Sequence, residues 1–110
     1  MYHYKTIKIE INKRVGIIEF NRPEVMNAFN EEMVREVTSA IKELNNDKSV
    51  ACIIIKGNGR CFSAGFDMKE ASQKSIKDQD QWEKELKKDF DFTMQFWHSK
   101  KPTIAAVHGY

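Results

Sequence analysis

A glycine-rich stretch in the middle of the chain, residues 57–70, has the composition of an anion-binding turn. It follows an apolar segment, contains Gly57, Gly59 and Gly65, and leads into residues that favour a helix. Gly65 supplies backbone freedom that a residue with a Cβ lacks, and the first amides of a helix have no intrahelical acceptor. Amides fixed where negative charge develops are worth about 2.7–4 kcal/mol each in a transition state. The stretch therefore predicts an oxyanion-binding turn suited to the chemistry of a carbonyl group.

The elements before this turn are predicted from apolar spacing. Ile7, Ile9 and Ile11 alternate with charged residues, and a second apolar segment follows at 15–20, which predicts a β-hairpin. Asn30 precedes two glutamates and an apolar stripe of helical spacing, so we expect it to cap a helix that ends at 45–47.

The segment 50–55 is apolar at successive positions, which is typical of a strand in the middle of a parallel sheet. We expect helices to cover both of its faces. Strand, helix and strand in this order predict a crossover unit, and ligands favour the carboxyl end of such strands. The glycine-rich turn begins at that end.

A long helix is predicted from about residue 76 to 98, followed by a strand at 103–107. Its apolar side chains recur every three or four residues, which indicates a face in the core or in a subunit interface rather than a nucleic-acid stacking platform. This stripe consists of Trp82, Leu86, Phe90, Met94 and Trp97.

Composition excludes several classes of protein. The net charge is +2, with 18 basic residues interspersed among 16 acidic ones, so we expect no nucleic-acid partner. The apolar runs are too short to cross a membrane, and the first residues lack the core of a signal peptide, so we expect a cytoplasmic protein. Cys52 and Cys61 lack zinc-site spacing, and we expect no metal and two reduced thiols. A packing role for Cys61 is favoured over a nucleophilic one.

Three segments together indicate a family: 21–29 (NRPEVMNAF), 61–69 (CFSAGFDMK) and 101–110 (KPTIAAVHGY). In order and spacing they resemble the crotonase (enoyl-CoA hydratase/isomerase) superfamily over essentially the whole chain. The resemblance implies an α/β fold of the ββα spiral type, of which residues 1–110 form an N-terminal, coenzyme A-binding part that we interpret as truncated at its carboxyl end. It also implies acyl-CoA thioester substrates, no separate cofactor, and a trimer or hexamer for the full-length protein.

The resemblance assigns the backbone N–H of Phe66 to the oxyanion hole. It places coenzyme A along two segments, with contacts from Val25, Met26, Ala28, Ala64, Phe66, Asp67, Met68 and Lys69. Typical enoyl-CoA hydratases carry alanine at the position of Phe66, so its ring is expected to reshape the acyl pocket if it points inward. From the residues themselves, we expect Asp67 to cap a helix rather than act as a general base, and Glu70 to face solvent.

The preferred function is that of an enoyl-CoA hydratase, with enoyl-CoA isomerase or another branch of the family as the alternative. The resemblance places the second oxyanion donor and the acid–base glutamates beyond residue 110, so we expect the 110-residue chain alone to be inactive. A different reading is a non-catalytic module that binds coenzyme A or another subunit. A nucleotide-binding enzyme is the weakest reading, because the glycine-rich turn matches neither common phosphate-binding motif.

Overall fold

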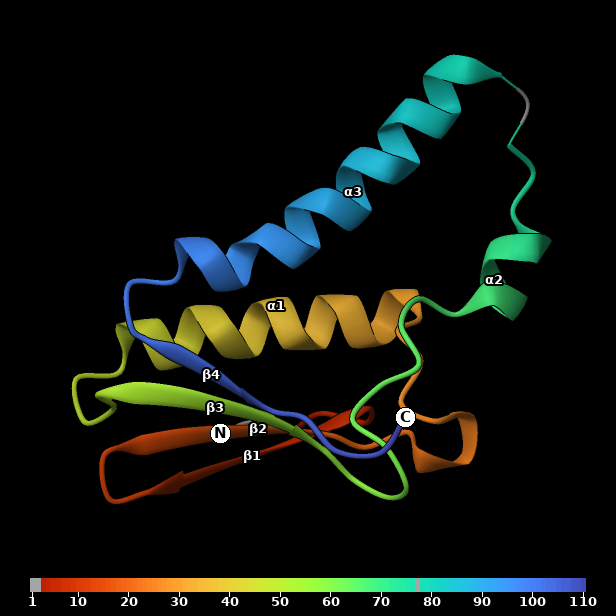
Figure 1. The fold of residues 1–110 in the computed structure, drawn as a ribbon. Helices are drawn as coiled ribbons and strands as arrows, with labels where there is room; N and C mark the ends of the chain where they lie inside the picture. Colours follow the sequence, from red (N-terminus) through yellow and green to blue (C-terminus); the bar gives the residue numbers. More distant parts are fainter. Residues whose placement is uncertain (1–2, 77) are drawn as a thin grey trace.

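The computed structural model describes residues 3–76 and 78–110. Its centre is a four-stranded sheet in the order β1-β2-β3-β4 (Figure 1). The first pair of strands is antiparallel and the other two pairs are parallel, so β3 lies between parallel neighbours as predicted. The strands are β1 (Ile7–Asn12), β2 (Val15–Phe20), β3 (Cys52–Gly57) and β4 (Thr103–Ala106).

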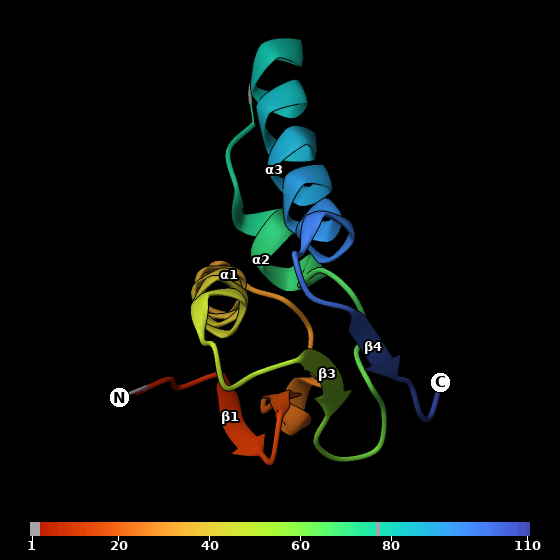
Figure 2. The same cartoon turned by 90° about the vertical axis from the view of Figure 1, so that its left-hand side faces the viewer.

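The α-helices of the described residues lie on one face of this sheet, as Figures 1 and 2 show from two directions. α1 lies across the sheet, while the amino-terminal half of α3 rises away from it. The helical segments are the 3-10 turn η1 (Pro23–Val25), α1 (Glu31–Asn46), α2 (Met68–Gln73) and α3 (Gln79–His98). None of these helices is long and apolar enough to cross a membrane.

The core forms between α1 and the sheet. Asn30 caps α1 as predicted, because its side chain accepts a hydrogen bond of 2.9 Å from the backbone N–H of Met33. One stripe of α1 is buried and faces alternate residues of β2 and β3, which confirms the spacing argument. The buried residues of the helix are Met33, Val37, Ala40, Ile41 and Leu44.

The prediction that helices cover both faces of the third strand is wrong for the described residues. Ile53 and Ile55 are buried beneath α1, whereas Ile54, on the opposite face, is half-buried. A continuous apolar run shows that both sides of a strand tolerate burial, but it does not specify which segment covers each side. The strand also begins two residues later than predicted.

The apolar stripe of the long helix was predicted to lie in the core or in a subunit interface, and the first of these alternatives is wrong for most of its residues. Trp82, Leu86, Phe90 and Trp97 are between 53% and 80% exposed, while Phe92 is buried and Phe96 is half-buried. Helical spacing identifies an apolar stripe, but which side packs depends on how the helix meets its neighbours. The helix begins at Gln79, with the Asp78 side chain as its cap, rather than at 76; residue 77 lies outside the described residues.

Candidate functional site

The glycine-rich turn has the backbone conformation that its sequence predicts. Gly65 has a φ of +91°, a conformation that residues with a Cβ rarely adopt, and no atom lies within 4 Å of the place where a Cβ would be. Gly57 is required for a different reason, because a Cβ there would lie 2.4 Å from the carbonyl oxygen of Phe62. The turn therefore needs glycine for its conformation at one end and for close backbone approach at the other.

Backbone hydrogen bonds join this turn to the segment before α1. The N–H of Phe29 donates to the carbonyl oxygen of Gly65 at 2.8 Å, and the N–H of Asp67 donates to the carbonyl oxygen of Phe29 at 2.9 Å. Phe29 and Phe66 thus form a parallel bridge. Both bonds use the neighbours of Phe66, so the Phe66 N–H points away from Phe29, and no residue among 3–76 and 78–110 accepts a hydrogen bond from it. The turn therefore fixes a backbone donor without an intramolecular acceptor.

Asp67 caps α2, which confirms its predicted structural role. Its carboxylate accepts a hydrogen bond of 3.0 Å from the backbone N–H of Glu70, and this bond is the main reason that its pKa lies below the usual range. Arg22 adds an ion pair, with Nη2 3.4 Å from Oδ2 of Asp67, and also donates to the carbonyl oxygen of Ala28. A single guanidinium therefore links the two segments assigned to coenzyme A.

The predicted coenzyme A residues lie on two adjacent segments, 25–28 and 64–69. The N–H of Ala64 donates to the carbonyl oxygen of Met26 at 2.9 Å, which holds the segments side by side. Val25, Ala64, Met68 and Lys69 are exposed, and Met26 and Ala28 are half-buried. Half of the eight predicted residues are therefore exposed to solvent, on two segments that lie side by side.

The prediction that Glu70 faces solvent is wrong. Glu70 is half-buried, and its carboxylate accepts a hydrogen bond of 3.1 Å from the backbone N–H of Glu31. The first amides of α1 lack intrahelical acceptors, so a carboxylate from α2 satisfies one of them. Its position next to the Asp67 cap did not reveal this contact, because the partner is 39 residues away in the sequence.

Asn27 organises the site and was not singled out by the sequence analysis. It is fully buried, and its side-chain amide donates to the carbonyl oxygens of Asn58, Cys61 and Phe62 at 2.8–3.2 Å. Its side-chain oxygen accepts a hydrogen bond of 2.8 Å from the N–H of Arg22. The only sequence signal was its place inside the 21–29 motif. Asn27 connects that motif to the glycine-rich turn.

Cys61 is buried beside this network. Its Sγ lies 3.5 Å from the carbonyl oxygen of Met26, and both cysteines are free. Burial of the thiol agrees with the packing role. Among the described residues, no group of three or more histidine, cysteine, aspartate or glutamate side chains is placed to hold a metal ion.

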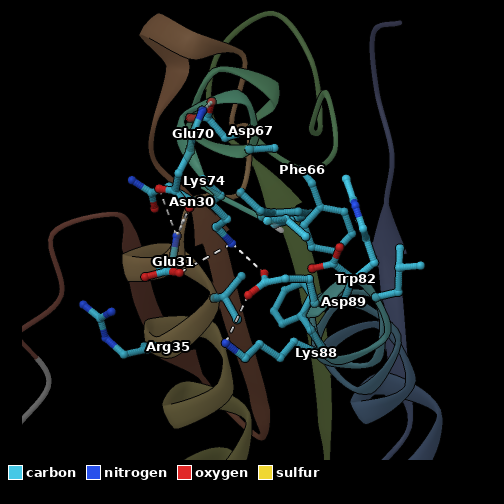
Figure 3. Close-up of a pocket in the computed structure, with 17 residues that line it drawn as sticks. Asn30, Glu31, Arg35, Phe66, Asp67, Glu70, Lys74, Trp82, Lys88 and Asp89 are labelled. Carbon is cyan, nitrogen blue, oxygen red and sulfur yellow. Dashed lines mark hydrogen bonds and ion pairs between the residues drawn. The ribbon is translucent and has the colours of Figure 1, made fainter. Parts of the chain in front are cut away.

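A pocket of about 330 Å³ opens between α1, α2 and α3 (Figure 3). Phe66 lines it, and the Phe66 ring packs edge-on against Phe29 and Phe92, with ring centroids 5.9 and 6.1 Å apart. The ring therefore points inward, which is the condition under which it was predicted to reshape an acyl pocket. Of the predicted coenzyme A residues, Phe66 and Asp67 line this pocket and the others do not.

Charged side chains border the same pocket. Lys74 of the α2–α3 connection lies 2.8 Å from Oε2 of Glu85 and 3.5 Å from Oε1 of Glu31, so it joins α1 to α3. The hydrogen bond to Glu85 is the main reason that the pKa of Lys74 is raised. Asp89 also lines the pocket, and burial raises its pKa. The pocket thus combines an aromatic wall with a charged rim.

Comparison with known proteins places these features in one family. The family model described as enoyl-CoA hydratase/isomerase matches residues 10–110. A probable enoyl-CoA hydratase, echA8, of Mycobacterium tuberculosis is 40% identical, over 97% of this chain and 40% of its own length. A protein of Arthrobacter named 4-chlorobenzoyl coenzyme A dehalogenase-2 is 31% identical, over 94% and 38%.

The fold matches as well. The crystal structure of an enoyl-CoA hydratase/isomerase from Xanthobacter autotrophicus Py2 superimposes with a TM-score of 0.87 at 43% identity, covering 97% of this chain and 40% of that one. The chain thus spans about 40% of the length of the relatives that it matches.

Proposed function

Because the chain belongs to the enoyl-CoA hydratase/isomerase family, we propose that residues 1–110 are the N-terminal part of an acyl-CoA enzyme, a hydratase in the first instance. The observation that carries this proposal is the Phe66 N–H, which the bridge to Phe29 holds in place and which has no acceptor in the described part of the chain. A donor of this kind binds the oxygen of a thioester carbonyl. It needs no rearrangement when the reaction begins, which is the property of an oxyanion hole.

The reaction follows from that contact. Water attacks the β-carbon of a double bond conjugated to the thioester, and the π electrons move through the α-carbon to the carbonyl oxygen. The negative charge on that oxygen is larger in the transition state than in the substrate, so the Phe66 N–H lowers the barrier. The attacking water loses one proton, which leaves a hydroxyl group on the β-carbon, and a proton is delivered to the α-carbon as the carbonyl re-forms. Isomerisation uses the same enolate but moves a proton instead of adding water, and it remains the alternative.

The coenzyme A part of the substrate would lie along segments 25–28 and 64–69. Four residues of these segments predicted to contact it are exposed, and the Lys69 ammonium would attract the phosphates. The thioester is the substrate, and the proposal includes no separate cofactor. The groups that transfer protons are assigned to parts of the family fold outside these 110 residues, so we expect the isolated chain to bind acyl-CoA but to turn it over slowly.

Assembly and location belong to the proposal too. We expect a trimer or hexamer, and the exposed stripe of α3 offers apolar surface for a subunit contact. A cytoplasmic location remains a prediction, since relatives from Dictyostelium discoideum and Pongo abelii are named as mitochondrial. The same stripe supports the second candidate, a non-catalytic module that binds coenzyme A or another subunit. That module would sediment as a defined oligomer, whereas concentration-dependent aggregation would contradict it.

The test of the catalytic proposal is to replace Phe66 by proline in the full gene product and to compare it with the alanine variant. Proline removes the N–H, which donates to no acceptor among residues 3–76 and 78–110, so no hydrogen bond of the described residues is lost. Hydration of crotonyl-CoA should fall by about 10²–10³-fold in kcat. Phe66→Ala retains the N–H and should change the preference for acyl chains instead.

Circular dichroism establishes that both variants are folded. A folded Phe66→Pro protein with undiminished kcat would refute the role of the amide. An equal loss in the alanine variant would show that the ring, and not the N–H, is what catalysis needs.

A further inference from the structure

The side of α3 that faces the pocket carries two carboxylates. Trp82, Glu85, Asp89 and Phe92 recur every three or four residues and all line the pocket. Such spacing places side chains on one face of a helix. Two of the four are aromatic: Phe92 is buried, and Trp82 is 53% exposed. The other two are carboxylates, and their surroundings differ.

The negative charge of Glu85 is balanced by two neighbouring lysines. Lys74 lies 2.8 Å from one of its oxygens, and Lys88 lies 3.4 Å from the other. The hydrogen bond from Lys74 is the main reason that the pKa of Glu85 is lowered. Glu85 therefore has a structural role, which is to join α3 to the α2–α3 connection.

Asp89 is half-buried and has no such partner. Among residues 3–76 and 78–110, none donates a hydrogen bond to its carboxylate or lies within ion-pair distance of it. Burial is the largest influence and raises its pKa; Glu85 acts in the same direction, while Lys74 and Lys88 act against it. Figure 3 shows Asp89 turned into the pocket, on the side of Phe66 and Trp82. A carboxylate that lines a pocket and accepts no hydrogen bond from the described residues can accept one from a donor on a bound molecule.

Among the described residues, the other walls of the pocket supply no hydrogen-bond donor to the Asp89 carboxylate. From α1 they contribute Glu31, whose carboxylate pairs with Lys74, and Arg35; from α2 they contribute Asp67 and Glu70, whose carboxylates accept backbone hydrogen bonds. Lys74, Lys88 and Arg35 also line the pocket, but among the described residues none of these cations lies within ion-pair distance of Asp89. The volume of about 330 Å³ is at the lower end for small-molecule sites, so the occupant is small.

We propose that Asp89 determines specificity in this pocket by accepting a hydrogen bond from a hydroxyl group on a short acyl chain, beyond the carbons that react. This inference rests on the proposed function, because it takes the pocket to hold the acyl part of a coenzyme A thioester. A site built around a hydrogen bond discriminates strongly against an analogue that lacks the donor, since its polar group is then left unpaired. An acyl chain ending in a carboxylate is repelled by the same charge.

The experiment compares two saturated thioesters that cannot be hydrated, butyryl-CoA and 4-hydroxybutyryl-CoA, by calorimetric titration of the full gene product. We expect the hydroxylated probe to bind at least about tenfold more tightly. The preference should disappear in Asp89→Leu and persist in part in Asp89→Asn, whose amide oxygen still accepts a hydrogen bond. The matched control is Asp91→Leu, since Asp91 pairs with Lys87 on the exposed side of the same helix and should leave the preference unchanged.

Equal binding of the two probes, or a preference that persists in Asp89→Leu, would overturn the assignment of Asp89 and leave the proposed function standing. Failure of the unmodified protein to bind either probe would instead overturn the proposed function. Asp89→Asn is nearly isosteric and keeps the test decisive if the leucine variant does not fold.

Discussion

Phe29 and Phe66 are paired through their backbones, and this pairing determines the direction of the Phe66 N–H. The amides of Phe29 and Asp67 donate within the bridge, whereas the amide of Phe66 donates to no acceptor among the described residues. The rings of the two phenylalanines are also in contact, with centroids 5.9 Å apart, so side-chain packing supports the backbone pairing.

Gly65→Ala should destabilise the protein by about 1–2 kcal/mol, because alanine is strained at a φ of +91°. A Cβ at this position meets no atom within 4 Å, so the cost is conformational rather than steric. Urea denaturation measures it. Gly65→Asn should cost less, since asparagine tolerates positive φ better than alanine does. Equal stability of the alanine variant and the unmodified protein would contradict the role of this glycine.

Asn27→Asp should destabilise the protein by about 3 kcal/mol. The change keeps the size of the side chain and its tolerance of the observed φ of +55°, but it replaces an amide donor by an oxygen that faces three carbonyl groups. Thermal or urea unfolding gives the difference. Asn12→Asp, at an exposed position, is the control and should change stability little. A small effect at Asn27 would show that water or rearrangement replaces its network.

Asp67→Asn should lower stability near neutral pH by at most about 1 kcal/mol, because the pair with Arg22 is lost while an amide oxygen can still cap α2. The pKa of Asp67 is lowered in the fold, so the contribution of its charge is present above the unfolded pKa of about 3.9 and disappears as the pH falls through the lower folded pKa. Denaturation curves between roughly pH 2 and 7 should converge for the two proteins at the acid end. Curves that stay parallel would show that the charge of Asp67 does not matter.

Lys74→Met should loosen the connection between α1, α2 and α3, since its ammonium pairs with Glu31 and Glu85. We expect a loss of about 0.5–1 kcal/mol that shrinks in high salt, together with faster amide hydrogen exchange in α2. Lys84→Met, at an exposed position of α3, is the matched control. Unchanged exchange in α2 would mean that the packing of the helix, rather than the ion pairs, holds it.

Much of the fold could be predicted because the signals are local. Asn30 and Asp67 cap helices where their side chains favour capping, and Gly65 adopts the positive φ that the turn was expected to need. The family could be recognised from the same segments, because they carry the turn and its neighbours. The role of the Phe66 amide remains a prediction that the geometry supports.

The partners of the site could not be predicted in the same way. The contacts of Asn27 with Asn58 and of Arg22 with Asp67 join residues that are 31 and 45 positions apart in the sequence. Each of these residues, taken alone, has no feature in the sequence that indicates its partner. Likewise, the stripe on α3 indicated an apolar side but not its phase. It was the way α3 packs that turned Phe92 inward and left Trp97 exposed.

The sequence by itself thus determined the order of strands and helices, the caps, the turn and the family, because these depend on residues close together in the chain. Only the tertiary structure decided which face of α3 borders the pocket, which carboxylates are paired, and where the Phe66 N–H points. Those properties depend on side chains and amides brought together from distant segments, and a linear pattern carries no information on their mutual distance.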